Sequence, residues 1–139
     1  MNELTKSPQI SVVMPVYNGA RFLEESIESI LNQTFKDFEF IIIDDGSTDD
    51  TINIIKNYAE RDKRIKVIIN DENLGIVKSL NSGISLSEGK YIARMDADDI
   101  SLSNRFDVQF KYIQKHPEIG ALGGNVQSIN ENGNKINRT

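Results

Sequence analysis

The sequence contains no cysteine, no tryptophan and a single histidine among its 139 residues. The absence of cysteine excludes disulfide bonds, thiolate nucleophiles and cysteine-based zinc or iron–sulfur sites. The one histidine, His116, stands beside Pro117 at the end of an amphipathic stretch, which is typical of a solvated helix end, so we do not expect a histidine base. Apolar runs such as Ile41–Ile43 are far shorter than the roughly 20 residues of a membrane span. Residues 1–8 lack the apolar segment of a secretory signal, and we therefore expect a cytoplasmic protein.

Positive charge is also in short supply, with 16 Lys and Arg against 21 Asp and Glu, for a net charge of −5. Sequence-independent binding to nucleic acid or anionic lipid is therefore not expected, and we predict no nucleic-acid partner. A chain of this length and hydrophobic content predicts one domain with a packed core. We assign residues 1–8 to an N-terminal extension and residues 9–139 to a single domain, with a polar tail from about residue 134.

Short apolar runs alternate with amphipathic stretches along the chain. The apolar runs predict strands at Ile10–Val16, Phe38–Ile43, Ile65–Ile69 and Lys90–Met95. The amphipathic stretches predict helices at Ala20–Gln33, from Ser47 to the charged run Glu60–Arg64, at Ile76–Ser85 and at Asn104–Lys115. We expect Ser47 to cap the second helix and Gly83 to interrupt the third. Ile119–Ile129 is expected to be extended, and Asn132-Gly133 predicts a hairpin turn.

This alternation predicts an α/β fold with a mostly parallel sheet and helices on both faces. Ligands in such sheets bind beyond the carboxyl ends of the strands. The residues found there are acids, amides, glycines and a tyrosine: Pro15–Gly19, Asp44–Asp49, Asp71, Asn73, Gly75 and Asp96–Asp99. Like charges gathered at one edge repel each other, so we expect a divalent cation to bind among them.

Asp96-Ala97-Asp98 is the best candidate for that cation. While the chain stays extended, the two carboxylates point to the same face. Mg²⁺ and Mn²⁺ prefer oxygen ligands, so one carboxylate would hold the metal while the other accepts hydrogen bonds from a sugar or ribose hydroxyl. An exposed acidic loop is the alternative interpretation. Arg94 either balances the negative charge at this edge or contacts the ligand, and both possibilities stay open.

Two further features at the strand ends fit a nucleotide. Asp44-Asp45-Gly46-Ser47 is either a turn with a helix cap or a site whose carboxylate accepts hydrogen bonds from a base, with Gly46 allowing close approach. Tyr17 is either a surface aromatic or a ring that stacks on the base. No G-x-G-x-x-G follows the first strand, which excludes the dinucleotide-binding fingerprint.

Together the motifs resemble the N-terminal half of a family-2 glycosyltransferase with the Rossmann-like GT-A fold. The matching stretches are Ser11–Asn18 (SVVMPVYN), Ser29–Phe35 (SILNQTF), Ile43–Asp49 (IDDGSTD), Asn73–Gly75 (NLG) and Gly89–Asp99 (GKYIARMDADD). The resemblance extends from about residue 8 to about residue 135. Each motif is modest alone, but their order and spacing together make the resemblance strong.

The resemblance implies transfer of a sugar from a nucleotide diphosphate, usually UDP, to a saccharide or lipid-linked acceptor hydroxyl. The transfer would invert the anomeric centre and serve polysaccharide or glycoconjugate synthesis. By the same resemblance, the base would meet Pro15, Val16, Tyr17 and either Asp44 or Asp45, the diphosphate would lie near Asn73 and Gly75, and Asp96 would face the ribose or donor sugar. Mn²⁺ or Mg²⁺ would be held by Asp98 with help from Asp96 and Asp99.

One departure from the family pattern concerns catalysis. The family's general base, an Asp or Glu, lies far downstream of the D-x-D, so we expect it beyond Thr139. The chain is then a C-terminally truncated donor-binding half, an engineered fragment or a truncated gene product, with missing segments or partners able to bring it to the inner face of a membrane. A smaller departure is Ser103, where the family often has proline.

Three alternative functions stay open at this point. They are a catalytically inactive nucleotide-sugar-binding module, a phosphatase-like hydrolase with Asp96 as nucleophile, and a phosphoacceptor receiver domain. The glycosyltransferase hypothesis makes one geometric demand, which is that Tyr17, Asp45 and Asp98 share a groove.

Overall fold

The computed structural model describes residues 6–137. Most of the expected N-terminal extension and the last two residues of the expected tail therefore lie outside the described residues. The chain divides into two compact units, one ending at Asp107 and the other beginning at Val108, and each is described by itself.

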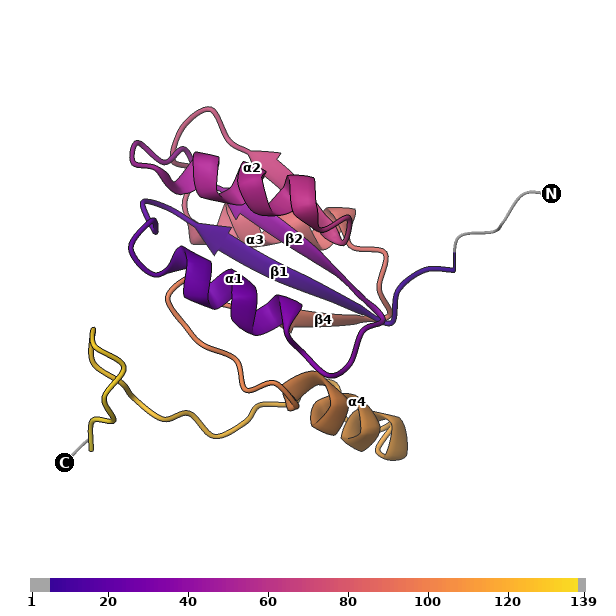
Figure 1. Cartoon of the computed structure of the whole chain (residues 1–139). Helices are drawn as coiled ribbons and strands as arrows, with labels where there is room; N and C mark the ends of the chain where they lie inside the picture. Colours follow the sequence, from indigo (N-terminus) through magenta and orange to yellow (C-terminus); the bar gives the residue numbers. More distant parts are fainter. Residues whose placement is uncertain (1–5, 138–139) are drawn as a thin grey trace. The chain divides into compact units, whose positions relative to one another are not determined.

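Strands and helices alternate along the described chain (Figure 1). Their order is β1 (Ile10–Val16), α1 (Leu23–Leu31), β2 (Phe38–Asp44), α2 (Thr51–Arg61), β3 (Ile65–Ile69), α3 (Ile76–Leu86), β4 (Tyr91–Arg94) and α4 (Arg105–Lys115). Each predicted strand and helix is present, with ends that differ by a few residues. No helix within residues 6–137 is long and apolar enough to cross a bilayer.

The strands form one sheet in the order β3-β2-β1-β4, and all pairings are parallel. The ladder between β1 and β2 continues to the pair Val16↔Asp44. The ladder between β1 and β4 ends earlier, at Val13↔Arg94. The predicted parallel sheet is confirmed, and its central strand extends past the paired end of β4.

Helices cover both faces of the sheet, as predicted. Figure 1 shows α1 and α2 on one face and α3 on the other. Under α3, Val13, Ile41 and Ile43 form a cluster against which Leu80 packs. Alternate residues of a strand point to opposite faces, so neighbours such as Val12 face α1 and α2. Helix α1 contributes the fully buried side chains Leu23, Ile27 and Ile30.

Helix α3 packs closely on the sheet because of one glycine. A Cβ atom at Gly83 would lie 2.5 Å from Val13 Cγ1 and 2.8 Å from Ile43 Cδ1. The helix is continuous from Ile76 to Leu86, so the prediction that Gly83 interrupts it is wrong. The absence of a side chain at Gly83 allows the helix to approach the strands closely, and the helix continues through this residue.

The described part of the second unit contains most of α4 and a short turn near the C-terminus. Ile129 and Lys135 form an antiparallel bridge, and Gly133 has a φ of 79°. The hairpin turn predicted at Asn132-Gly133 is confirmed. Residues 119–128 belong to no strand, so the segment expected to be extended adds nothing to the sheet.

Candidate functional site

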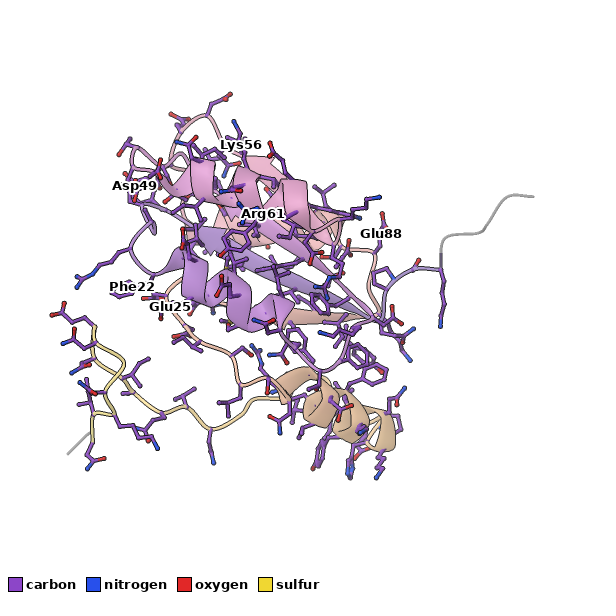
Figure 2. The ribbon with its side chains drawn as sticks, in the orientation of Figure 1. Phe22, Glu25, Asp49, Lys56, Arg61 and Glu88 are labelled. Atoms are coloured by element: carbon purple, nitrogen blue, oxygen red, sulfur yellow. The ribbon has the colours of Figure 1, made fainter. Side chains whose placement is uncertain are left out.

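A cleft of about 340 Å³ opens in the first unit, at the carboxyl ends of β1 and β4. Its lining consists of Pro15, Val16, Tyr17, Asn18, Gly19, Phe22, Ile76, Asp96, Ala97 and Asp98. The structure thus brings Tyr17 and Asp98 into one cleft, while Asp45 does not line it. Figure 2 shows Phe22 and Asp49 at this edge of the sheet and Glu88 at the opposite edge.

Asn18 links the loop after β1 to the loop after β2. Its φ of 49° lies in the left-handed region, which asparagine adopts more readily than most residues. The Asn18 backbone N–H donates to Ser47 Oγ (2.9 Å), and the Asn18 Oδ1 accepts from the backbone N–H of Thr48 (2.8 Å). The two loops are therefore joined in both directions at the mouth of the cleft.

The next two residues of the first loop are held in the same way. The backbone N–H of Gly19 donates to Thr51 Oγ1 (3.0 Å), and that of Ala20 donates to Asp49 Oδ2 (3.2 Å). Hydrogen bonds from the Thr51 side chain and backbone lower the pKa of Asp49. Asp50 occupies the N-cap position of α2, so the prediction that Ser47 caps this helix is wrong. The Ser47 hydroxyl is instead engaged with the loop after β1.

Asp45 holds the loop that follows β3. It is only 4% exposed and accepts hydrogen bonds from Asn70 Nδ2 (2.8 Å) and from the backbone N–H groups of Leu74 and Gly75 (2.9 Å each). Burial alone would raise the pKa of Asp45, but these hydrogen bonds outweigh it and hold the pKa below its ordinary value. The carboxylate is therefore ionised, and its hydrogen bonds fix the conformation of residues 70–75. We call this loop, together with residues 17–20 and 45–51, the latched loops.

The neighbours of Asp45 differ from what the sequence suggested. Asp44, the last residue of β2, is 3% exposed, and its Oδ1 is buried without a hydrogen-bond partner. A Cβ atom at Gly46 would lie 2.6 Å from the carbonyl carbon of Glu72 and 2.8 Å from the nitrogen of Asn73. The space at Gly46 is filled by the chain's own backbone, so the expectation that this glycine admits a ligand is wrong.

Residues 96–99, which we call the acidic turn, follow β4. The chain leaves the extended conformation at Ala97, and the backbone N–H of Asp99 donates to the carbonyl of Asp96 (3.2 Å). The argument that an extended chain points Asp96 and Asp98 to one face is therefore wrong, although both residues line the cleft. Arg94 forms an ion pair with Asp96 at 3.0 Å, and both side chains are largely exposed, so the pair contributes little to stability.

Negative charge accumulates on the acidic turn. Burial, and then the charges of Asp96 and Asp98, raise the pKa of Asp99 above its ordinary value. Within residues 6–137 no group of three or more His, Asp or Glu side chains is arranged to hold a metal ion. Two cleft-lining carboxylates still fit Mg²⁺ or Mn²⁺, because such ions commonly take one or two carboxylates and complete their shell with water and substrate phosphates.

Sequence reasoning had placed eight of the ten lining residues at the strand ends, although it gave Asn18, Gly19 and Ala97 no role. It missed Phe22, which follows the first of these motifs closely enough to have been considered. Ile76, which is 52% exposed at the first turn of α3, had no such signal. Its place in the cleft depends on the loop after β3, which Asp45 holds at the end of β2. Asn73 and Gly75, predicted to meet the diphosphate, belong to that loop and do not line the cleft.

The model of the family described as Glycosyl transferase family 2 matches residues 11–139. The chain is 49% identical over 129 residues to an uncharacterized glycosyltransferase of Methanocaldococcus jannaschii, covering 91% of this chain and 44% of that protein. The chain thus spans less than half of this relative's length.

Solved structures are similar as well. TarS of S. aureus in complex with UDP-GlcNAc superposes with a TM-score of 0.73 at 30% identity, over 78% of this chain and 32% of that one. The mannosyltransferase PcManGT of Pyrobaculum calidifontis, in complex with GDP-Man and Mn²⁺, superposes with a TM-score of 0.63 at 27% identity. The match covers 69% of this chain and 29% of that one.

Proposed function

The chain belongs to glycosyl transferase family 2, and on that basis we propose that its cleft binds a nucleotide-diphosphate sugar, with UDP as the favoured nucleotide. The observation that carries the proposal is that Tyr17 and Asp98 line the same cleft. An aromatic ring and a carboxylate at one strand edge suit the two ends of a nucleotide diphosphate. Family membership leaves no place for the receiver and phosphatase-like alternatives.

The base is proposed to stack on Tyr17, against Pro15 and Val16. Tyr17 is 50% exposed and its ring is available to a planar ligand. Asp44 or Asp45 is proposed to accept the hydrogen bond from the base. Asp44 Oδ1 has no hydrogen-bond partner, whereas both oxygens of Asp45 already hold residues 70–75. Asn73 and Gly75 are proposed to lie near the diphosphate, within the loop that Asp45 fixes.

The divalent cation is proposed to bind Asp98, with help from Asp96 and Asp99. Bound there, Mn²⁺ or Mg²⁺ would neutralise the departing diphosphate as a Lewis acid. Burial, and then the charges of Asp96 and Asp98, raise the pKa of Asp99, and a bound cation would favour the ionised carboxylate, which supports this proposal. The Mn²⁺ seen with GDP-Man in PcManGT supports it independently. Arg94 is proposed to screen the charge of Asp96 until the donor arrives.

Sugar transfer needs a general base for the acceptor hydroxyl. Among the described residues, the carboxylates that line the cleft are Asp96 and Asp98, which the cation and donor would occupy. We therefore propose that this chain supplies donor binding in an inverting transfer to a saccharide or lipid-linked acceptor. The base is proposed to lie beyond Thr139.

Isothermal titration with UDP tests this function. We expect binding in Mn²⁺ that weakens strongly when EDTA replaces the metal. Asp98→Asn should reduce the affinity for UDP in Mn²⁺ by about 30-fold, a loss of about 2 kcal/mol. Asp37→Asn changes an exposed carboxylate just before β2; it serves as the matched control and should bind like the original chain. Absence of UDP binding in Mn²⁺ would overturn the proposal.

A sugar-transfer assay tests the missing base. With UDP-sugars and hydroxyl acceptors, the chain should bind donor and show little turnover. Robust transfer by the purified chain would refute the idea that the base lies outside it.

A further inference from the structure

Helix α1 carries a polar stripe on its buried face. Ser26 is 1% exposed, Gln33 just past the helix is fully buried, and Ser29 lies between them. The spacing of three and four residues places these side chains on one face of the helix. Buried polar groups need hydrogen-bond partners, so the question is which part of the chain they hold.

Two members of the stripe hold the segment that follows the acidic turn. Ser29 Oγ accepts from the backbone N–H of Ser101 (3.0 Å). Gln33 Nε2 donates to the carbonyl of Leu102 (2.7 Å), and Gln33 Oε1 accepts from the backbone N–H of Phe106 (3.1 Å). This segment is therefore fixed to α1 by several bonds.

Ser26 reaches the acidic turn itself. Its Oγ lies 2.7 Å from the carbonyl oxygen of Ala97 and 2.7 Å from that of Asp99. These two carbonyls flank Asp98 on both sides. A hydroxyl has a single proton to donate, so the two carbonyls share it, and both are drawn toward α1.

We propose that Ser26 is a positioning residue for the cation site, and this inference rests on the proposed function. Three of the four residues in the acidic turn are aspartates, and like charges so close together favour conformations that spread them apart. Ser26 opposes that spreading by holding the backbone on both sides of Asp98. The Asp98 carboxylate is then kept at the cleft before a cation binds.

The inference is tested with Ser26→Ala in the presence of UDP. The Mn²⁺ concentration that gives half-maximal UDP binding should rise about tenfold, the effect typical of losing a group that orients a metal ligand. The affinity for UDP at saturating Mn²⁺ should change less than about twofold, because saturating metal restores the site. Ser26→Thr, which keeps the hydroxyl, should keep the half-saturating concentration near that of the original chain.

Ser29→Ala is the matched control. It removes, from the same helix, a hydroxyl that donates to the backbone carbonyl of Ser26 (2.8 Å) and accepts from the backbone N–H of Ser101 (3.0 Å). Neither partner belongs to the acidic turn, and the Ser26 hydroxyl is left in place. A loss of folded protein would change the number of binding sites and leave the half-saturating Mn²⁺ unchanged. An equal shift for Ser26→Ala and Ser29→Ala would overturn the inference, and so would no shift. If Ser26→Ala does not fold, Ser26→Cys gives the same test with little change in volume.

A second measurement uses the metal-free chain. Amide hydrogen exchange at Asp99, whose N–H bonds to the Asp96 carbonyl, should be faster in Ser26→Ala than in Ser29→Ala. Equal exchange in both variants would contradict the role of Ser26. If the original chain does not bind UDP, the proposed function fails while this exchange result still decides whether Ser26 fixes the turn.

Discussion

The latched loops and the acidic turn lie at the same edge of one sheet, yet different forces hold them. Side-chain hydrogen bonds between neighbouring loops fix the latched loops, and they centre on Asn18 and Asp45. The acidic turn has one internal backbone bond, an exposed ion pair from Arg94 and the hydroxyl of Ser26 behind it. Its carboxylates repel one another.

The difference indicates a division of labour within the site. The proposed base pocket is prepared before a ligand arrives, which reduces the ordering cost of binding. The proposed cation site carries negative charge that Arg94 and Arg105 offset only in part, because the pKa of Asp99 is still raised by burial and by its acidic neighbours. Substitutions in the latched loops should therefore lower the free energy of unfolding. Substitutions in the acidic turn should mainly change the affinity for the cation and for the nucleotide-sugar donor.

The largest effect is expected for Asp45→Ala. Losing the carboxylate leaves the N–H groups of Leu74 and Gly75 without their acceptor, and we expect a loss of about 3 kcal/mol in the free energy of unfolding. Urea denaturation measures the loss. Asp71→Ala, an exposed acid in the same loop, should change the free energy by less than about 0.5 kcal/mol. Similar values for both variants would contradict the assigned role of Asp45.

Acid should act through the same residue. The pKa of Asp45 is held below its ordinary 3.8 in the folded chain, so the folded state releases this proton more readily than the unfolded state. The resulting stability is complete above the unfolded pKa and is lost as the pH falls through the lower folded pKa. The free energy of unfolding should therefore fall less steeply below pH 4 in Asp45→Asn than in the original chain. Parallel curves would show that Asp45 is not the group responsible.

Much of the fold follows from local patterns, whereas the latched loops do not. β1 and β2 are mostly apolar and are buried along their whole length, which is typical of a parallel strand covered on both faces. Asn18 and Ser47 are separated by 29 positions, and nothing in either motif specifies that they bond to each other. Gly46 was expected to admit a ligand, but its close neighbour is the backbone of the loop after β3, which only the folded chain reveals.

A smaller effect is expected at Asn18, where conformation and hydrogen bonding can be separated. Asn18→Ala loses the bond to Thr48 and places alanine at a φ of 49°, so we expect a loss of about 1.5 kcal/mol. Asn18→Gly loses the same bond without the backbone strain, and the loss should be about 0.5 kcal/mol. Thermal or urea unfolding compares the two. A larger loss for the glycine variant would contradict this account.

The smallest effect, of opposite sign, is expected in the acidic turn. Asp99→Asn removes one of three mutually repelling charges, so the metal-free chain should gain up to about 0.5 kcal/mol in its free energy of unfolding. High salt should abolish the gain, because it screens exposed charges. Destabilisation by Asp99→Asn at low salt would contradict the contrast between the two regions.

The unequal ladders of β1 explain where the cleft comes from. β4 stops pairing with β1 at Val13↔Arg94, while β2 continues to Val16↔Asp44. The paired end of β4 therefore lies three residues, about 10 Å, short of the paired end of β2. A ligand bound at Tyr17, as we propose, would extend past the end of β4, where the acidic turn begins. Extending β4 by residues that pair with β1 would remove this offset. The depth of the cleft should therefore depend on the length of one strand, and changing it would leave the core residues as they are.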